Sequence, residues 1–375
     1  MSKVFFTTAR GLKWDYKQSF VGRVERMLSE TGILDGRFDK GEWVAVKTHF
    51  GSDGAHRVVR PVFLRKVVDA LKGVGAKPYV TDTVRIMGLD YLEIANQNGI
   101  NHLSVDVPVI LADGLYGNDS IIVKAPGEIL GEITVASAIH DATAMVVCSH
   151  VKGHIQAGYA GAIKNLAMGG VSASHREGGW KKGRGQMHCH AEVPLTWNPE
   201  ICTYCSQCEN VCPKGAIYFA EDEFRYDEKK CWACGRCARV CPSGGLTLPV
   251  EDTTFQKSLV ESAAAVLSTF KPGKVVYVNF MTEIQPECDC MPSCDTPMLQ
   301  DQGVLVSDDL VAVEQATIDM LRKASPLPGS VAEERGCKPG DDIIGMVNPR
   351  DYMLQVETAE RFGLGKKEYE FIEIN

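Results

Sequence analysis

The sequence lacks several features that would place it in a common functional class. No block of basic residues stands out in the 375-residue chain, and its net charge is −8, so nucleic acid is not an expected partner. No apolar run approaches the roughly 20 residues of a membrane span. A Gly-x-Gly-x-x-Gly pattern beside a strand-like stretch is also missing, which leaves no signal for a flavin or nicotinamide site.

The first residues also lack the long apolar core and small-residue cleavage site of a signal peptide, because residues 1–6 enter a strand-like stretch directly. We therefore expect a cytoplasmic protein. In a reducing cytoplasm, 14 cysteines indicate metal sites rather than disulfides. With 45% hydrophobic residues, the chain is long enough to bury the cores of two or three domains.

Cysteine is the residue whose spacing is most informative. Residues 202–213 and 231–242 both read Cys-x2-Cys-x2-Cys-x3-Cys-Pro. This run is typical of segments that hold two [4Fe–4S] clusters, where each cluster takes three cysteines from one run and the fourth from the other. The expected ligands of the first cluster are Cys202, Cys205, Cys208 and Cys241, and those of the second are Cys231, Cys234, Cys237 and Cys212.

Two zinc sites or a disulfide framework are the alternatives for these eight cysteines. Zinc usually takes separated Cys-x2-Cys pairs rather than four closely spaced cysteines repeated twice. Disulfides need an oxidising compartment. The segment resembles a two-cluster bacterial ferredoxin, and we therefore predict an inserted α+β two-[4Fe–4S] ferredoxin-like domain over residues 196–250.

Strand-like and helical patterns alternate on both sides of this segment. Residues 43–47 and 78–82 read as strands around a helix that begins at Pro61, and residues 144–148 form another apolar strand. A helix over 255–270, a strand over 275–280 and a helix capped by Asp309 follow the segment. The prediction is an α/β body that has a mixed or parallel sheet with helices on both faces. Its two parts span residues 1–195 and 251–375.

Polar side chains gather where two strands of the body end. Because ligands bind at the carboxyl ends of parallel strands, we expect one shared cleft; two solvated loops are the alternative. Histidine suits proton transfer, and lysine or arginine suits a carboxylate or phosphate. The candidate catalytic residues are His49, His56, His154 and Lys164. The candidate substrate-binding residues are Lys47, Arg57, Arg60, His150, Lys152 and Asn165.

Three further cysteines, Cys288, Cys290 and Cys294, lie within a short stretch beyond a later strand. Thiolates with a nearby carboxylate or histidine suit zinc or iron, so these cysteines form a candidate additional metal site. A redox-active thiol pair and buried cysteines without a function are the alternatives. His188, in the run Met-His-Cys-His at 187–190, is a candidate partner in this site.

Nearly the whole chain resembles the family called domain of unknown function 362. The matching residues are Lys-Thr-His-Phe-Gly at 47–51, Ala-Asp-Gly at 112–114, Val-Lys-Gly-His at 151–154, Lys-Asn-Leu-Ala-Met-Gly at 164–169 and Cys-Asp-Cys at 288–290. This resemblance implies an architecture but no settled activity.

A second resemblance is to lactate racemases. The matching residues are His154, Ala157, Gly158, Tyr159, Gly161 and Lys164. In those enzymes the lysine carries a nickel-pincer nucleotide and the histidine acts in acid–base catalysis, and Ala-His-Arg at 55–57 is similar to their Gly-Thr-His-Arg. The resemblance implies that His154, Lys164 and His56 share one cleft. Ala162 replaces a glycine of the motif, and racemases lack the ferredoxin insertion.

The function that these observations favour is that of an iron–sulfur oxidoreductase. Two clusters would pass single electrons from a soluble electron carrier or redox enzyme to an anionic small molecule in the cleft. The alternative is a non-enzymatic ferredoxin-like carrier or metal-handling partner that docks another redox enzyme. A third class is a redox-independent isomerase with structural clusters.

Overall fold

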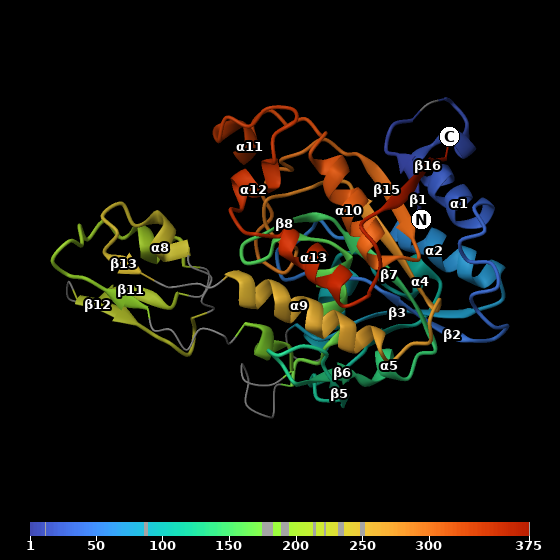
Figure 1. Cartoon of the computed structure of the whole chain (residues 1–375), viewed down its shortest axis with the longest axis horizontal. Coiled ribbons are helices and arrows are strands. Elements are labelled where there is room, and N and C mark those ends of the chain that lie inside the picture. Colours follow the sequence, from blue (N-terminus) through green and yellow to red (C-terminus); the bar gives the residue numbers. More distant parts are fainter. Residues whose placement is uncertain are drawn as a thin grey trace.

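The computed structural model describes residues 1–11, 13–85, 89–174, 183–188, 195–212, 215–220, 223–231, 236–247 and 252–374. An eight-stranded sheet forms its centre, with the strand order β16–β1–β15–β14–β7–β2–β3–β4 (Figure 1). These strands are β1 Ser2–Thr8, β2 Trp43–Lys47, β3 Lys77–Asp82, β4 Val109–Leu111, β7 Ala144–His150, β14 Val275–Met281, β15 Gly303–Ser307 and β16 Tyr369–Glu373.

The central sheet is mixed. Strands β4, β3, β2, β7 and β14 are parallel neighbours. Strand β15 is antiparallel to both β14 and β1, and β16 lies parallel to β1 at the edge. Because the five parallel strands point the same way, their carboxyl ends meet along one edge of the sheet.

Helices cover both faces of the sheet. Successive side chains of a strand point to opposite faces, so Met145 and Val147 of β7 pack on one side, and Val146 and Cys148 pack on the other. The first side is covered by α6 Ala162–Gly170, α9 Asp252–Leu267, α10 Leu310–Leu321 and α13 Met353–Arg361; the second is covered by α1 Phe20–Glu30, α2 Pro61–Gly73 and α3 Leu89–Gln97. The predicted α/β class, with a mixed sheet between two layers of helices, is confirmed.

Shorter elements complete the body. Two hairpins pair β5 Ser120–Lys124 with β6 Glu132–Ala136, and β8 Lys152–His154 with β9 Gly158–Ala160. The short helices are α4 His102–Val105, α5 Ser137–His140, α11 Val331–Glu334 and α12 Ile343–Val347. No helix in the described part of the chain is long and apolar enough to cross a membrane.

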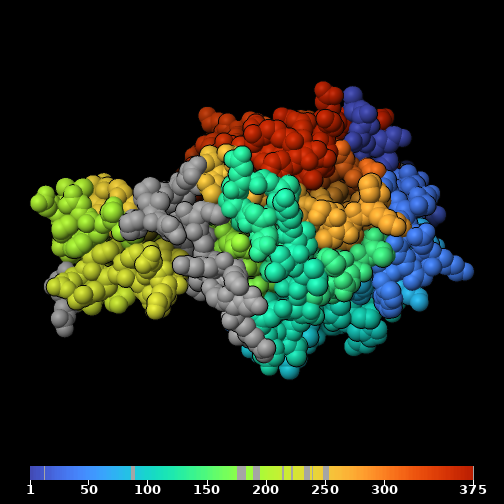
Figure 2. All heavy atoms as spheres, turned by 60° about the horizontal axis from the view of Figure 1, so that its bottom comes forward, coloured from blue at the N-terminus to red at the C-terminus, as the bar shows by residue number. Residues whose placement is uncertain are grey.

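A small lobe, which we define as residues 195–247, projects from one side of the body (Figure 1, Figure 2). It contains β10 Thr196–Trp197, α7 Gln207–Asn210, β11 Ile217–Ala220, β12 Glu223–Tyr226, α8 Arg236–Val240 and β13 Leu246–Thr247. Among its described residues, the buried hydrophobic cluster consists of Leu195, Cys208, Ile217, Cys237 and Leu246. Two of these five side chains are thiols, so cysteine forms part of this small core.

One buried carboxylate joins helix α9 to the hairpin of β5 and β6. Glu261 of α9 is 2% exposed, and its oxygens accept hydrogen bonds from the backbone N–H groups of Glu128, Ile129 and Leu130 at 2.9–3.3 Å. These residues form the turn between β5 and β6. A single side chain therefore satisfies three N–H groups that would otherwise lack partners.

We predict that Glu261→Ala lowers the free energy of unfolding of the body by about 2–4 kcal/mol, because buried N–H groups lose their acceptor. Urea denaturation followed by circular dichroism measures the change. Lys257→Ala, at a half-buried position of the same helix, serves as the control and should cost less than about 1 kcal/mol. Equal losses for the two variants would contradict the prediction.

Candidate functional site

A cavity of about 520 Å³ lies at the edge of the sheet where β2, β3 and β7 end. A volume of this size is typical of small-molecule sites. Five basic side chains line it, whereas Asp82 is the one carboxylate among the described lining residues, so the cavity favours an anion. The charged and polar lining residues include Lys47, His49, Ser52, Asp82, Arg85, Ser149, His150, Lys152, His154, Gln156, Lys164, Asn165, Arg184, His188 and Cys290.

The ends of β2 and β3 contribute a buried ion pair. Lys47 Nζ lies 2.8 Å from Asp82 Oδ1 and donates to Asn165 Oδ1 at 2.6 Å. A Cβ at position 169 would lie 2.1 Å from Lys47 Nζ, so Gly169 leaves the space that the ammonium occupies. Burial opposes ionisation of Asp82, yet the Lys47 ammonium and the contact with His49 hold its pKa well below the usual range.

His49 is oriented by the same carboxylate. Its Nδ1 lies 2.9 Å from Asp82 Oδ2, and the Tyr91 hydroxyl donates to that oxygen at 2.6 Å. Nδ1 therefore carries the proton in the neutral ring, which leaves the lone pair on Nε2. Nε2 has no hydrogen-bond partner in the described part of the chain. An oriented imidazole with a free Nε2 at a cavity wall can accept or donate a proton.

A second carboxylate, Asp289, lies behind the wall formed by β7 and β8. It is fully buried and contacts His150 Nδ1 at 3.0 Å and Lys152 Nζ at 2.6 Å. The side chain of Gln285 donates to it at 2.8 Å. His150 Nε2 lies 2.8 Å from the carbonyl oxygen of Thr282, so both ring nitrogens face acceptors. Despite burial, His150 and Lys152 hold the pKa of Asp289 far below its usual range.

Cys288 and Cys290 lie beside Lys164 and His154. One potential ligand atom each from His154, Cys288 and Cys290 lies within 4.8 Å of the others, and no other such trio occurs in the described part of the chain. Lys164 Nζ donates to Cys288 Sγ at 3.2 Å. Burial opposes ionisation of Cys288, but the hydrogen bond from the Cys290 thiol and the charge of Lys164 hold its pKa well below the usual range.

His154 is held by its Nδ1 atom. This nitrogen accepts hydrogen bonds from the backbone N–H groups of Gln156 at 3.2 Å and Ala157 at 2.9 Å. Burial and the neighbouring Lys164 charge lower the pKa of His154 well below its ordinary value. The ring is therefore neutral, and its proton is on Nε2.

Several residues that the sequence indicates for the cleft lie outside the cavity wall. Arg57 and Arg60 both pair with Glu283, at 3.1 and 3.0 Å. His56 is exposed, and its backbone N–H donates to Cys294 Sγ at 3.4 Å. Cys294 thus contacts the loop of His56 and is not part of the trio formed by His154, Cys288 and Cys290.

His188 does line the cavity. Its Nδ1 lies 2.9 Å from Gln156 Oε1, and its ring is 5.2 Å from that of Phe255. Cys189, which follows it, lies outside the described residues.

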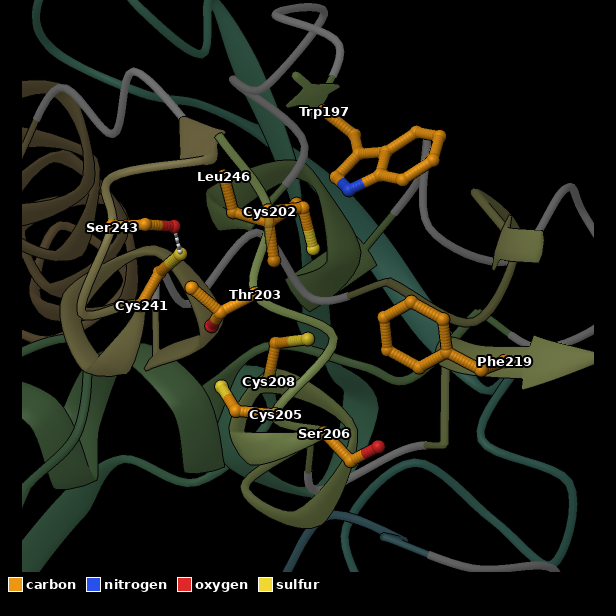
Figure 3. Close-up of a pocket in the computed structure, with 10 residues that line it drawn as sticks. All are labelled: Trp197, Cys202, Thr203, Cys205, Ser206, Cys208, Phe219, Cys241, Ser243 and Leu246. Carbon is orange, nitrogen blue, oxygen red and sulfur yellow. Dashed lines mark hydrogen bonds between the residues drawn. The ribbon is translucent and has the colours of Figure 1, made fainter. Parts of the chain in front are cut away.

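In the lobe, Cys202, Cys205, Cys208 and Cys241 line one small cavity (Figure 3). These are the residues expected to bind the first cluster, and Cys241 comes from the second run. Trp197, Phe219 and Leu246 complete the wall. The cavity measures about 10 Å³, so the set of donors, not the volume, is what indicates a metal group. Cys212, Cys231 and Cys237 of the expected second set are described, whereas Cys234 is not.

The sequence reasoning missed the two buried carboxylates and Arg184. Asp82 is the last residue of a predicted strand, so the strand-exit rule that selected Lys47 would also have found it. Asp289 lies between Cys288 and Cys290, where the cysteines drew attention to metal ligands. Arg184 follows a stretch rich in glycine and charged residues and has no periodic neighbours, so no signal in the sequence would have selected it.

The sequence matches the family described as Domain of unknown function (DUF362) over residues 44–319. The chain belongs to the DUF362 family. The matched range includes the lobe, the cavity residues on both sides of it and the Cys288–Cys290 turn. No curated protein matches the sequence.

Two solved structures are similar to this DUF362 chain. A Thermotoga maritima protein from a structural genomics programme has a TM-score of 0.37 and 9% identity, and the match covers 91% of this chain and 59% of that protein. The chain therefore spans less than two thirds of the Thermotoga protein. The lactate racemase apoprotein from Thermoanaerobacterium thermosaccharolyticum has a TM-score of 0.40 and 9% identity, with 100% and 83% of the two chains covered.

Helix α6, which carries Lys164 and Asn165, begins against a buried carboxyl group. Glu314 of α10 accepts a hydrogen bond from the backbone N–H of Ala162 and another from Asn279 at 3.1 Å. Burial raises the pKa of Glu314 from its ordinary value of 4.5 to about 7. The folded chain therefore binds this proton more tightly than the unfolded chain does.

We predict that this carboxyl makes stability fall as the pH rises. Its stabilising contribution is complete below about pH 4.5 and declines by about 3 kcal/mol as the pH rises from there through about 7, since one pKa unit corresponds to about 1.4 kcal/mol. Glu314→Gln keeps an acceptor for Ala162 but cannot ionise. Urea denaturation of both proteins between about pH 5 and 8 should therefore show the variant gaining stability relative to the native chain. Parallel pH profiles would contradict the assignment.

Proposed function

We propose that this DUF362 chain is an iron–sulfur oxidoreductase. In this proposal, two [4Fe–4S] clusters in the lobe supply single electrons when bound, and an anionic small molecule binds in the cavity of the body. The observation that carries the proposal is that one chain has both a cavity lined by cysteines in the lobe and a positively charged cavity in the body. A protein that only carries electrons needs the cysteine-lined cavity but not the positively charged one.

The donor set of the lobe supports an iron–sulfur group. Cys202, Cys205 and Cys208 of the first run line one small cavity together with Cys241 of the second run. This exchange of the fourth cysteine is the arrangement expected of a segment that holds two clusters. Backbone N–H groups donate to two sulfurs of the lobe, from Tyr204 to Cys202 and from Ala216 to Cys212, at 3.4 and 3.2 Å. Such bonds are a common means of tuning cluster potentials.

The thin core of the lobe supports the same proposal. A unit of this size needs metals, disulfides or another support when its hydrophobic core is small. Three of the expected cluster ligands, Cys208, Cys237 and Cys241, belong to or pack against that core. Metal binding would therefore contribute directly to the folding of the lobe.

The cavity supplies the remaining elements of an oxidoreductase site. Lys47, Lys152 and Lys164 are each paired with an acidic side chain or a thiol, so Arg85 and Arg184 supply the excess positive charge that attracts an anion. His49 is the residue we assign to proton transfer, because Asp82 orients its ring and Nε2 has no partner in the described part of the chain. His154 donates from Nε2 and would orient a substrate oxygen.

We predict that each cluster depends on cysteines from both runs. Cys202→Ala and Cys241→Ala should each remove the same cluster, so either variant, and the double variant, should retain about four of about eight iron atoms per chain. Cys212→Ala combined with Cys241→Ala should lose both clusters. Iron and sulfide analysis of anaerobically purified protein measures this, with Cys337→Ser as the control. If the double variant loses the sum of the iron lost by Cys202→Ala and by Cys241→Ala, the two cysteines do not bind the same cluster.

The oxidoreductase activity itself is tested by reoxidation of reduced clusters. Dithionite-reduced protein is mixed with a panel of organic carboxylates and phosphate esters, and cluster absorbance is followed. At least one acceptor should accelerate reoxidation, and His49→Gln should slow that reaction by about 100-fold or more, because it removes the proton-transfer group. His102→Gln, an exposed histidine on α4, should leave the rate unchanged.

The same assay distinguishes the alternative, a carrier that docks another redox enzyme. The projecting position of the lobe favours this function as well (Figure 1). If no acceptor reoxidises the clusters, and if His154→Ala and Lys164→Ala leave electron transfer to a redox protein unchanged, the carrier function is supported and the oxidoreductase proposal fails.

A further inference from the structure

Cys288 and Cys290 lie in a tight turn that brings their sulfur atoms together. The backbone N–H of Met291 donates to the carbonyl oxygen of Cys288 at 2.8 Å and closes this turn. The backbone N–H of Cys290 donates to Cys288 Sγ at 3.3 Å. The two sulfurs lie within 4.8 Å of each other. The two sulfurs are therefore close enough in the fold to be candidates for a disulfide.

The residue between the two cysteines holds the turn in place. Asp289 is fully buried, and it contacts His150, Lys152 and Gln285 at 2.6–3.0 Å. These partners lie on β7, on β8 and in the loop after β14. The turn is therefore attached to the edge of the central sheet through the side chain of Asp289.

The two thiols have different environments. Cys288 is 1% exposed and accepts a hydrogen bond from Lys164 at 3.2 Å, whereas Cys290 lines the cavity. The Lys164 ammonium favours the thiolate at Cys288. The hydrogen bond from Lys164 goes to Cys288, so the negative charge of the pair belongs on Cys288 and the proton on Cys290. A thiolate beside a protonated thiol is the reduced form of a dithiol–disulfide pair.

The surroundings favour thiol chemistry over a metal ion. A histidine that binds a metal donates its other ring N–H to an acceptor. His154 has the opposite arrangement, because its Nδ1 accepts two backbone N–H groups and its proton is therefore on Nε2. The Lys164 ammonium also contacts Cys288 directly, and its charge would repel a metal cation at that sulfur.

We propose that Cys288 and Cys290 form a reversible dithiol–disulfide couple that stores two electrons at the cavity wall. That the electrons arrive from the clusters rests on the proposed function. The couple would convert one-electron steps in the lobe into a two-electron step in the body, which is what reduction of most organic molecules needs.

Reduction of the disulfide consumes two electrons and one proton. The Cys288–Cys290 disulfide takes one electron from each of two reduced clusters and one proton, and the S–S bond breaks. The products are the Cys288 thiolate, paired with Lys164, and the Cys290 thiol. In the reverse direction the pair loses two electrons to an organic acceptor in the cavity, the Cys290 proton is released and the S–S bond forms again.

A redox titration of the full-length, iron-loaded protein tests the couple. The protein is equilibrated with mixtures of reduced and oxidised dithiothreitol, quenched with acid and alkylated, and the peptide that contains residues 288–290 is analysed by mass spectrometry. The expected result is an intrapeptide disulfide that forms reversibly, disappears in Cys288→Ser and Cys290→Ser, and persists in Cys294→Ser and Cys337→Ser. Free thiols at every ratio, or a disulfide to Cys294, would overturn the proposal.

Lys164→Met tests whether the Lys164 ammonium stabilises the Cys288 thiolate. Loss of the ammonium removes a charge-assisted hydrogen bond from the thiolate, so the variant should shift the equilibrium about tenfold toward the disulfide, which corresponds to about 30 mV. Lys257→Met is the matched control and should show no shift. An unchanged equilibrium in Lys164→Met would contradict the assigned thiolate. If a bound metal protects Cys288 and Cys290 from alkylation, the two cysteines form a metal site and the proposed couple is wrong.

A last measurement separates failure of the couple from failure of the proposed function. Reduced methyl viologen, a one-electron donor, is added to protein with a preformed disulfide. Regeneration of the thiols should be at least about tenfold slower in Cys241→Ala, which lacks one cluster. If the protein is loaded with iron but never forms the disulfide, the couple is contradicted and the proposed function is not. If the disulfide titrates normally but its thiols are regenerated equally fast in Cys241→Ala, the couple is supported. That result would contradict the supply of electrons to the couple by the clusters of the lobe.

Discussion

Three lysine ammonium groups are buried along one edge of the sheet, and each requires an anion nearby. Removing a charge from water costs several kcal/mol unless a partner compensates for it. Lys47 is paired with Asp82, Lys152 with Asp289, and Lys164 with Cys288. Two of the three anions come from one short turn that follows β14. The cavity wall therefore depends on a segment that lies far from the lysines in sequence.

This dependence explains how the body remains one unit although the lobe interrupts its sequence. Strand β14, which follows the lobe, pairs with β7, which precedes it. The parallel register places the end of β14 beside His150, and the chain then turns back so that Asp289 reaches His150 and Lys152. The sheet sets the register, and the ion pairs then fix the positions of the side chains around the cavity.

The fold could be predicted from the sequence further than the site could. Apolar runs at 43–47, 144–148 and 275–280 mark three of the five parallel strands, because a strand buried on both faces is apolar throughout. The strand-exit rule brought Lys47, His49, His150 and Lys152 together. It does not give the direction of a side chain on a loop, and therefore it could not separate Arg57 and Arg60, which turn toward Glu283, from the cavity residues. Nor does spacing show that Lys164 contacts Cys288, because that contact joins α6 to a turn more than 100 residues later.

The cysteines of the lobe and those of the body illustrate how surroundings decide the chemistry of a thiol. In the lobe, Cys205 is exposed, Cys202 and Cys241 are half-buried and Cys208 is buried, with apolar side chains and backbone N–H groups around them. In the body, Cys288 is buried against an ammonium group and beside a second thiol. Four thiolates that face one another need metal cations to balance their charge, whereas a single thiolate paired with lysine is already neutralised. Our two proposals therefore assign one-electron chemistry to the cysteines of the lobe and two-electron chemistry to those of the body.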